Sequence, residues 1–407
     1  MKKENAKTIL KNIPIFFMLG MLAAFAVSFI VLPKKDFSET ENRMLASFPE
    51  ISAKKILAGD FQKEFETYLS DRFPLRDTLL SVSVRADRLS GKQEINDVIY
   101  MKEKNTADGN AEIRLLDSYQ RPENTKKFVD SVNTFSGKLN RADTVVMVVP
   151  TAISLYEEKL PALVKMQNRP LQKDTLEYFE KEFSSSENAS LHYAEGVFDT
   201  LMQGMEAGED LYYRTDHHWK VRGAYRGYTL LAPYLEIPVI EKSASDFAVV
   251  SEDFYGTTWS KVCDRAISPD TIEIYDNPDW SGNLKVSYED TKETMDSPYN
   301  KEYLSKKDQY SMFLNNQHSL IRIENPNADM TRTDEENHSS LVIIKDSYAN
   351  SLVPFLIDQY ETIWVFDPRY YKGSISSWIN EHEEVEDVLI LYNLGTMDDD
   401  RGIGAIY

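Results

Sequence analysis

Four short runs of apolar, mostly β-branched residues constrain the fold of this chain more than any other feature. Such runs are typical of strands that are buried on both faces of a parallel sheet. They are TVVMVVP (144–150), LVIIKDS (341–347), TIWVFD (362–367) and DVLILYN (387–393). Segments with helical spacing of apolar residues alternate with them, at residues 124–139, 171–183, 221–235 and 348–359. The alternation predicts an α/β layered domain.

The sequence predicts that the chain consists of three parts. Residues 1–35 form a cytoplasmic tail and an apolar anchor, and residues 36–120 form a stalk and helices that are interrupted at Phe73-Pro74. Residues 121–407 form the α/β domain. Within that domain, residues 245–330 carry isolated strand-like pieces among polar turns, so we expect a mainly β and loop insertion there.

The anchor is the segment IPIFFMLGMLAAFAVSFIVL (13–32), which contains no charge. A helix of that length spans ~30 Å, enough to cross the hydrocarbon core of a bilayer. Lysines precede it and acidic residues soon follow it, which predicts a single-pass cell-membrane protein with a cytoplasmic N-terminus and an extracytoplasmic body. The alternative is a secreted protein whose signal peptide is cleaved at Ala24-Phe25-Ala26. We favour the anchor because apolar residues continue past that site.

The charge balance limits the partners of the body. The formal net charge is −20 and no basic stripe follows the N-terminal segment, which argues against nucleic acid. Cys263 is the single cysteine, so neither a disulfide framework nor a cysteine-based metal site is expected. No residue pattern indicates a cofactor.

The first candidate for chemistry is the turn in LVIIKDSYANSLVPFL. Strands of a parallel sheet deliver their carboxyl ends to the edge where ligands bind. Ser347 lies at such an end, where it would be exposed beside helix N-terminal amides that could stabilise an oxyanion. The alternative is that Ser347 merely caps the following helix, a common position for serine.

The second candidate is TDHHW, in which Asp216 precedes His217 and His218. Adjacent histidines chelate poorly and the other histidines show no metal spacing, so we expect no metal. In an extended segment Asp216 and His218 would share one face, and His217 and Trp219 would share the other. A carboxylate beside an imidazole fixes its tautomer, so His218 would be a general base and Asp216 its partner. The alternative is a polar turn that caps the next helix.

TDHHW resembles the signature of the DHHW family of bacterial exported proteins, which are similar to alginate O-acetylation proteins and share an SGNH-hydrolase-like domain. The resemblance covers most of the chain after the anchor. It rests on several motifs in one order, namely ENRMLASFP, SDRFPLRD, INDVIYMKEK, VVPTAISLYEEKLP, YYRTDHHW, KDSYANSLVPFL and DPRYY. It implies a three-layer sandwich with a parallel sheet, in a permuted order because the serine follows the Asp-His pair.

The resemblance also implies a Ser-His-Asp triad. Asp216, His218 and Ser347 take the places of acid, base and nucleophile. Lys345 stands where the Gly-Asp-Ser-type turn of the alginate acetylation relatives has glycine, and it could alter the turn or bring a charge to the pocket.

Three further residues are candidates for contacts with the reacting groups. Arg369 and Tyr370, in DPRYY, would stand near the nucleophile and could help to bind the acyl donor or the glycan. Asn393, at the end of its strand, is the candidate for the oxyanion donor by strand topology.

These features predict a membrane-anchored, extracytoplasmic O-acyltransferase that acts on a cell-surface polysaccharide, with acetyl favoured by the resemblance. Release of the acyl group to water would make the protein an esterase. A membrane partner that exports acyl groups would have to supply the donor. The alternative is a non-catalytic envelope protein that binds glycan or scaffolds an assembly on the same fold. A hydrolase of small esters is a third alternative.

Overall fold

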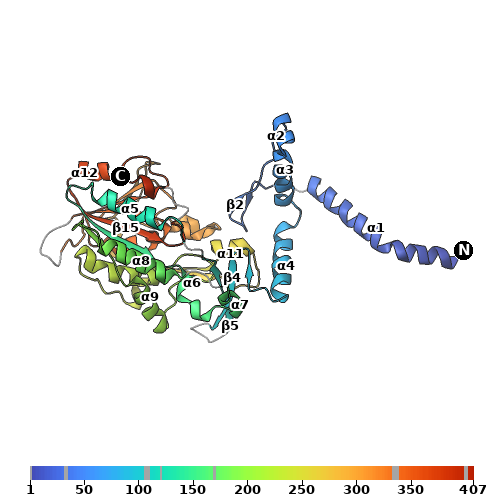
Figure 1. The fold of residues 1–407 in the computed structure, drawn as a ribbon, viewed down its shortest axis with the longest axis horizontal. Helices are drawn as coiled ribbons and strands as arrows, with labels where there is room; N and C mark the ends of the chain where they lie inside the picture. Colours follow the sequence, from blue (N-terminus) through green and yellow to red (C-terminus); the bar gives the residue numbers. More distant parts are fainter. Residues whose placement is uncertain are drawn as a thin grey trace. The chain divides into compact units, whose positions relative to one another are not determined.

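The computed structural model shows a mixed α/β chain (Figure 1). It describes residues 2–31, 35–104, 111–119, 122–167, 171–331, 339–397 and 402–407. The chain divides into two compact units. One unit consists of Met1–Gly91 and Val262–Arg265, and the other consists of Lys92–Lys261 and Ala266–Tyr407.

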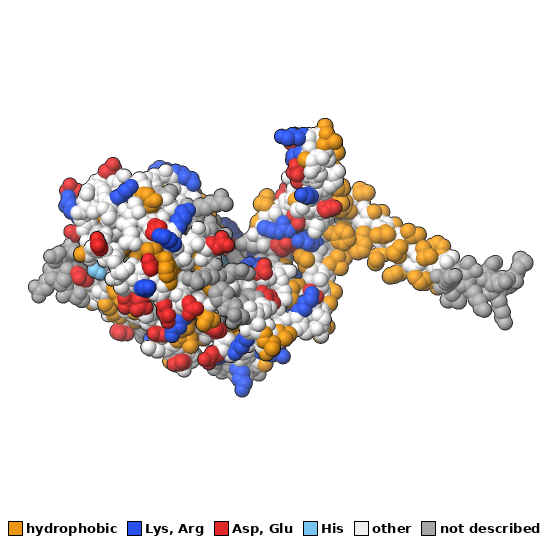
Figure 2. Space-filling view, viewed as in Figure 1, with side chains coloured by type: hydrophobic (Ala, Val, Ile, Leu, Met, Phe, Trp, Pro, Cys, Tyr) orange, Lys and Arg blue, Asp and Glu red, His pale blue; other side chains and the backbone are white. Residues whose placement is uncertain are grey.

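The first unit begins with helix α1 (Lys2–Val31), which contains the apolar stretch predicted from the sequence. Its segment Asn12–Val31 is the one helical stretch of the described residues that is long and apolar enough to span a membrane or to serve as a signal sequence. Figure 2 shows hydrophobic side chains along this helix. Leu32, the last residue of the predicted stretch, lies outside the described residues.

The rest of the first unit joins two of the motifs noted above. Its elements are β1 (Phe37–Ser38), β2 (Arg43–Met44), α2 (Ala53–Ala58), α3 (Asp60–Asp71) and α4 (Arg76–Leu89). Pro74 separates α3 from α4, which confirms the predicted break. The guanidinium group of Arg43 donates to both carboxylate oxygens of Asp71, at 2.9 and 2.6 Å. This ion pair holds ENRMLASFP against SDRFPLRD.

A mixed sheet forms the centre of the second unit, and within the described residues its strand order is β11-β10-β12-β14-β13-β15-β6-β7. The strands are β6 (Asp143–Val149), β7 (Leu191–Tyr193), β10 (Lys285–Tyr288), β11 (Glu293–Met295), β12 (Leu320–Glu324), β13 (Ser340–Lys345), β14 (Thr362–Phe366) and β15 (Val385–Asn393). The four predicted strands are adjacent, and they are parallel to one another and to β7. The expectation of a wholly parallel sheet is wrong, because β12, β10 and β11 extend it antiparallel from β14.

Helices cover both faces of the parallel part of the sheet. The helices are α5 (Thr125–Ser136), α8 (Gln172–Ser184), α9 (Val197–Glu206) and α10 (Val221–Leu231). All except α9, which was not predicted, lie close to predicted ranges. On β15, Tyr392 packs against Phe128 of α5, with ring centroids 5.6 Å apart. Its partner in register on β6 is Val148, so Met147 points to the opposite face. There a Cβ at Gly227 of α10 would lie 3.1 Å from Met147 Cε. The described part therefore has helix, sheet and helix layers.

The other elements of the second unit surround this core. They are β3 (Glu94–Ile95), β4 (Val98–Lys104), β5 (Ala111–Asp117), α6 (Ala152–Leu155), α7 (Ala162–Lys165), β8 (Phe247–Phe254), α11 (Thr257–Val262, which ends in the first unit), β9 (Asp270–Tyr275) and α12 (Ile375–Glu381). The helix predicted at 348–359 is wrong. Two 3₁₀ turns, η7 (Ser347–Ser351) and η8 (Val353–Phe355), stand there, since Pro354 has no N–H to continue an α-helix.

The TDHHW segment is a loop between α9 and α10 that is closed by a β-bridge between Tyr212 and Trp219. Trp219 is fully buried, and its indole N–H donates to the backbone carbonyl of Tyr348 at 2.9 Å. Glycine at the start of α10 allows this packing, because a Cβ at Gly223 would lie 2.5 Å from the carbonyl oxygen of Leu211. The hydrogen bond from Trp219 thus holds the loop against the turn that follows β13.

Candidate active site

The turn after β13 holds Ser347 at the carboxyl edge of the parallel strands. Asp346 fixes this turn with both carboxylate oxygens. Its Oδ1 accepts a hydrogen bond from the backbone N–H of Tyr348 at 2.9 Å. Its Oδ2 accepts one from the backbone N–H of Asn393 at 2.8 Å and another from the hydroxyl of Thr396. Ser347 is only partly buried, so its hydroxyl is fixed in place yet accessible.

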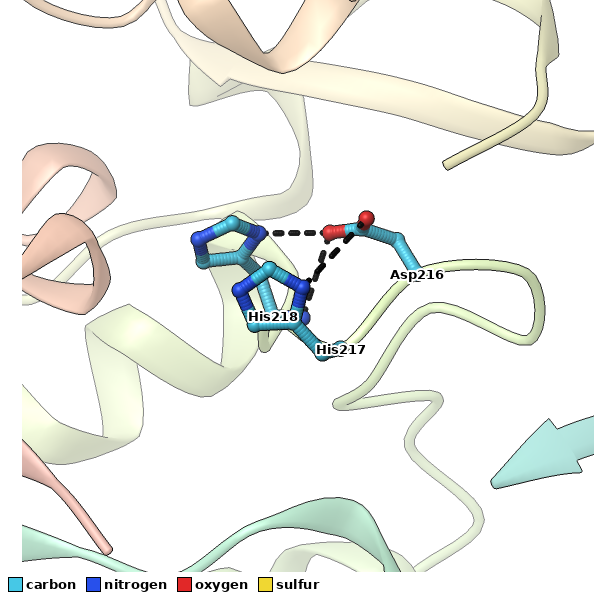
Figure 3. Close-up of side chains that lie close together, drawn as sticks. All are labelled: Asp216, His217 and His218. Carbon is cyan, nitrogen blue, oxygen red and sulfur yellow. Dashed lines mark hydrogen bonds and ion pairs between the residues drawn. The ribbon is translucent and has the colours of Figure 1, made fainter. Parts of the chain in front are cut away.

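The loop that contains TDHHW, here called the histidine loop, meets this turn. His218 Nδ1 lies 2.5 Å from Asp216 Oδ2 (Figure 3). His218 Nε2 lies 2.8 Å from Ser347 Oγ. The backbone N–H of His218 also donates to Asp216 Oδ2, at 3.2 Å. The structure therefore brings together the carboxylate, the imidazole and the hydroxyl that the sequence analysis singled out. In this arrangement the imidazole can take a proton from the serine while the carboxylate holds its tautomer.

The second carboxylate oxygen of Asp216 is held by residues that the sequence analysis missed. The backbone N–H and the hydroxyl of Thr257 donate to Asp216 Oδ1, at 2.7 and 2.8 Å. Gly256 is required beside them, because a Cβ there would lie 2.1 Å from the Cβ of Asp216. Both residues lie about 40 positions after Asp216, in a segment without a recognisable motif. No sequence signal connected them to the site.

The predicted alternation of side chains is wrong for His217. Residues 214–218 form bends rather than a strand, so the ring of His217 lies against that of His218, with centroids 3.8 Å apart and planes tilted by 36°. Tyr310 lies against His218 as well, at 3.7 Å and 10°. His217 Nδ1 lies 2.5 Å from the hydroxyl oxygen of Thr257. Asp216 and His218 still meet, because the backbone folds back on itself.

Burial and neighbouring charges set the protonation of the pair. Burial lowers the pKa of His218 to about 4, and the charges of His217 and Arg369 act in the same direction, against Asp216. Burial alone would raise the pKa of Asp216, but the charges of His218 and His217, and hydrogen bonds from His218 and Thr257, lower it. At neutral pH the carboxylate is therefore ionised and the imidazole is neutral, which is the form that accepts a proton.

Asp216, His217 and His218 are close enough together to hold a metal ion. Apart from His217 Nε2, their ligand atoms have partners within the protein. Both oxygens of Asp216 and both Nδ1 atoms have hydrogen-bond partners, and His218 Nε2 lies at Ser347. The donor set fits a hydrogen-bonded triad better than a metal centre.

Asp367, which follows β14, binds two of the predicted site residues. Lys345 Nζ lies 3.7 Å from Asp367 Oδ2. Lys345 is only 1% exposed, so the expectation that it brings a charge to the pocket is wrong, and burial lowers its pKa despite Asp367. Arg369 Nε and Nη2 donate to Asp367 Oδ1 and Oδ2, at 2.8 and 2.5 Å. The Arg369 side chain is 25% exposed, so it can also face a ligand.

The two other predicted residues are engaged elsewhere. The side-chain amide of Asn393 donates to the carbonyl oxygen of Val149 at 3.2 Å, and its Oδ1 accepts from the N–H of Gly395 at 2.7 Å. Tyr370 is exposed and its hydroxyl donates to Gln317. Among the described interactions neither side chain contacts Ser347. Asn393 stabilises the strand ends, and the geometry gives no support to an oxyanion role for it.

Replacement of Asp346 by asparagine should destabilise the site. The amide offers one acceptor oxygen in place of two, and its NH₂ group would face buried donors that lose their partner. We expect Asp346→Asn to lower the free energy of unfolding by about 2 kcal/mol, whereas Asp199→Asn on the exposed face of α9 should change it by less than about 0.5 kcal/mol. Urea unfolding of the full chain in detergent, followed by tryptophan fluorescence, measures both. Equal stability of the two variants would contradict the role given to Asp346.

Solved structures share the fold. A DHHW family protein from Eubacterium siraeum superposes with a TM-score of 0.59 at 22% identity, over 77% of this chain and 95% of that one. PatB1 from Bacillus cereus, solved with a sulfonyl adduct, gives 0.58 at 19% identity, over 77% and 99% of the two chains. The O-acetyltransferase domain of Pseudomonas putida AlgJ gives 0.41 at 10% identity, over 74% and 93%. The first two of these likenesses show a shared fold.

Sequence comparison identifies the family. No curated protein matches the chain. The family model described as DHHW protein matches residues 116–366, which is more than half of the chain and includes Asp216, His218 and Ser347. The chain belongs to the DHHW protein family.

Proposed function

We propose that this protein is a membrane-anchored, extracytoplasmic O-acyltransferase that carries an acyl group on Ser347. The contact that carries the proposal is the 2.8 Å separation between His218 Nε2 and Ser347 Oγ, supported by the 2.5 Å contact between His218 Nδ1 and Asp216. A protein that only binds glycan has no need for these three groups in hydrogen-bond reach. The geometry therefore favours catalysis over the binding alternative.

In the first half-reaction, Ser347 Oγ attacks the carbonyl carbon of the acyl donor and His218 Nε2 takes the hydroxyl proton. The bond between the carbonyl carbon and the donor's leaving oxygen then breaks, and His218 returns the proton to that oxygen. Asp216 stabilises the imidazolium while it exists. Arg369, whose charge acts on His218 and whose side chain is partly exposed, is our candidate for the group that offsets the negative charge on the carbonyl oxygen.

In the second half-reaction, a hydroxyl group of the acceptor attacks the acyl ester on Ser347. His218 takes its proton and passes it to Ser347 Oγ as that bond breaks. A sugar hydroxyl as the acceptor gives transfer, and water gives hydrolysis. The motif resemblance to O-acetylation proteins favours acetyl as the group and a cell-surface polysaccharide as the acceptor.

The fold and the N-terminal helix fit this proposal. The three-layer arrangement supports an SGNH-like domain, in a permuted order because Ser347 follows Asp216 and His218 in the chain. Helix α1 would keep the enzyme at the outer face of the membrane, where a partner in the bilayer could supply acyl groups. The lysines before the helix favour a cytoplasmic N-terminus and an extracytoplasmic body.

The direct test is hydrolysis of 4-nitrophenyl acetate by the full chain in detergent. We expect Ser347→Ala and His218→Ala each to lower nitrophenolate release at least about a hundredfold, because neither half-reaction proceeds without them. Tyr370→Phe, outside the triad, should stay within about threefold of the wild type. Equal rates for the wild type and both triad variants, all folded by circular dichroism, would contradict the proposal.

The pH dependence of the same reaction tests the state of His218. Since the neutral imidazole is the active form and its pKa is lowered to about 4, activity should stay constant as the pH falls to about 5 and disappear below about 4. Chromatography of the released nitrophenol measures this without relying on its ionisation, with Ser347→Ala as the background. Half-loss of activity near pH 6.5, the ordinary value for histidine, would show that the site does not lower this pKa.

A further inference from the structure

We propose that a cavity beside the triad is the acceptor site, and that His217 there binds a hydroxyl group of a glycan without anionic groups. The role depends on the proposed acyl transfer and specifies its second substrate. The cavity has a volume of about 160 Å³ and is lined in part by Asp216, His217, Thr151, Asn393 and Thr396. It therefore lies where the histidine loop meets the ends of β6 and β15.

Two residues that line the cavity contact neighbours of the nucleophile. The ring of His217 lies against that of His218, which contacts Ser347. The hydroxyl of Thr396 donates to Asp346, the residue before Ser347. We therefore infer that a sugar bound in the cavity can extend a hydroxyl group to an acyl group on Ser347.

Hydrogen bonding fixes which nitrogen of His217 is free to bind a ligand. The hydroxyl of Thr257 donates its proton to Asp216 Oδ1 at 2.8 Å. The oxygen of that hydroxyl can then only accept from His217, so His217 Nδ1 carries the proton at the 2.5 Å contact. With the proton on Nδ1, the lone pair is on Nε2 in this tautomer, and Nε2 accepts hydrogen bonds. The side chain is 28% exposed, compared with 6% for His218, so His217 can meet a ligand.

A larger cavity of about 520 Å³ lies next to the first, since Tyr119 and Ile153 line both. Its lining adds Ser154, Gln172 and Leu171. An acetyl group needs far less room than the two cavities provide together, whereas pockets of several hundred Å³ hold molecules as large as short oligosaccharides. An aromatic ring and polar side chains suit a sugar chain that extends away from His217.

The charges of the lining argue against an anionic acceptor. In the smaller cavity the ammonium group of Lys261 is paired with Asp117 at 3.0 Å. In the larger cavity two carboxylates, Glu157 and Glu158, accompany one ammonium group, that of Lys165. A glycan with carboxylate or phosphate groups would be repelled, whereas a neutral or amino sugar would not.

His217 would decide between transfer and hydrolysis. The attacking sugar hydroxyl gives its proton to His218 Nε2, and the bond between the acyl carbon and Ser347 Oγ breaks as His218 returns the proton to that oxygen. His217 Nε2 accepts a hydrogen bond from a neighbouring hydroxyl of the same sugar and orients it. A water molecule gains less from this contact, because it has no second hydroxyl to place there.

The test measures how acetyl from 4-nitrophenyl acetate is divided between cellotriose and water. We expect His217→Phe, which keeps a stacked ring without the nitrogens, to lower the ratio of acetylated cellotriose to free acetate about tenfold. For His217→Gln, which can still accept a hydrogen bond, the ratio should lie between that of His217→Phe and that of the wild type. His192→Phe, a matched change on the exposed side of β7, should keep the wild-type ratio. An unchanged ratio in His217→Phe would overturn the proposal.

A binding measurement separates this inference from the proposed function. Binding is measured in the Ser347→Ala variant, so that no acyl transfer is involved. Calorimetry should show that this variant binds cellotriose, and that adding His217→Phe or Leu171→Trp weakens the binding about tenfold. Cellotriose oxidised to its uronic acids should bind more weakly than cellotriose itself. Equal binding by all variants, or tighter binding of the anionic sugar, would overturn the acceptor site. Binding as expected without any acetyl transfer by the wild type would contradict the proposed function alone.

Discussion

One buried carboxylate, that of Asp216, determines how the candidate site is arranged. Among the described groups, the backbone and imidazole N–H groups of His218 donate to one oxygen, and the N–H and hydroxyl groups of Thr257 donate to the other. An ionised carboxylate in the interior is costly unless it is fully hydrogen-bonded. These donors compensate its charge and, in doing so, fix the ring that faces Ser347.

The parallel strands bring the nucleophile to this carboxylate from a distant part of the chain. Ser347 follows His218 by 129 positions, yet their side chains are in contact. Two further bonds lock the same segments together, from the Trp219 indole to the carbonyl oxygen of Tyr348 and from the Tyr348 hydroxyl to the carbonyl oxygen of His217. The tryptophan of TDHHW therefore has a structural role, and the histidine before it is the group that contacts the serine.

The sequence predicted the parts of the structure that depend on local patterns. Continuous apolar runs identified the four adjacent strands, and the Asp-x-His spacing together with a serine after a strand identified three side chains that the structure brings into contact. The predictions failed where contacts between residues that are far apart in the sequence determine the structure. The bends at 214–218 turned His217 towards His218, and Pro354 replaced an expected helix with 3₁₀ turns. Burial of Lys345 under the turn could not be inferred from a residue that is usually exposed.

The measurement that tests the central claim most directly is the location of the acyl group on the protein. The wild type would be treated with 4-nitrophenyl acetate, quenched in acid and digested, and its peptides analysed by mass spectrometry. The account predicts one acetyl group on the peptide that contains Ser347, and none on that peptide in the His218→Ala variant. Acetylation confined to lysines, or equal labelling of Ser347 in both proteins, would contradict it.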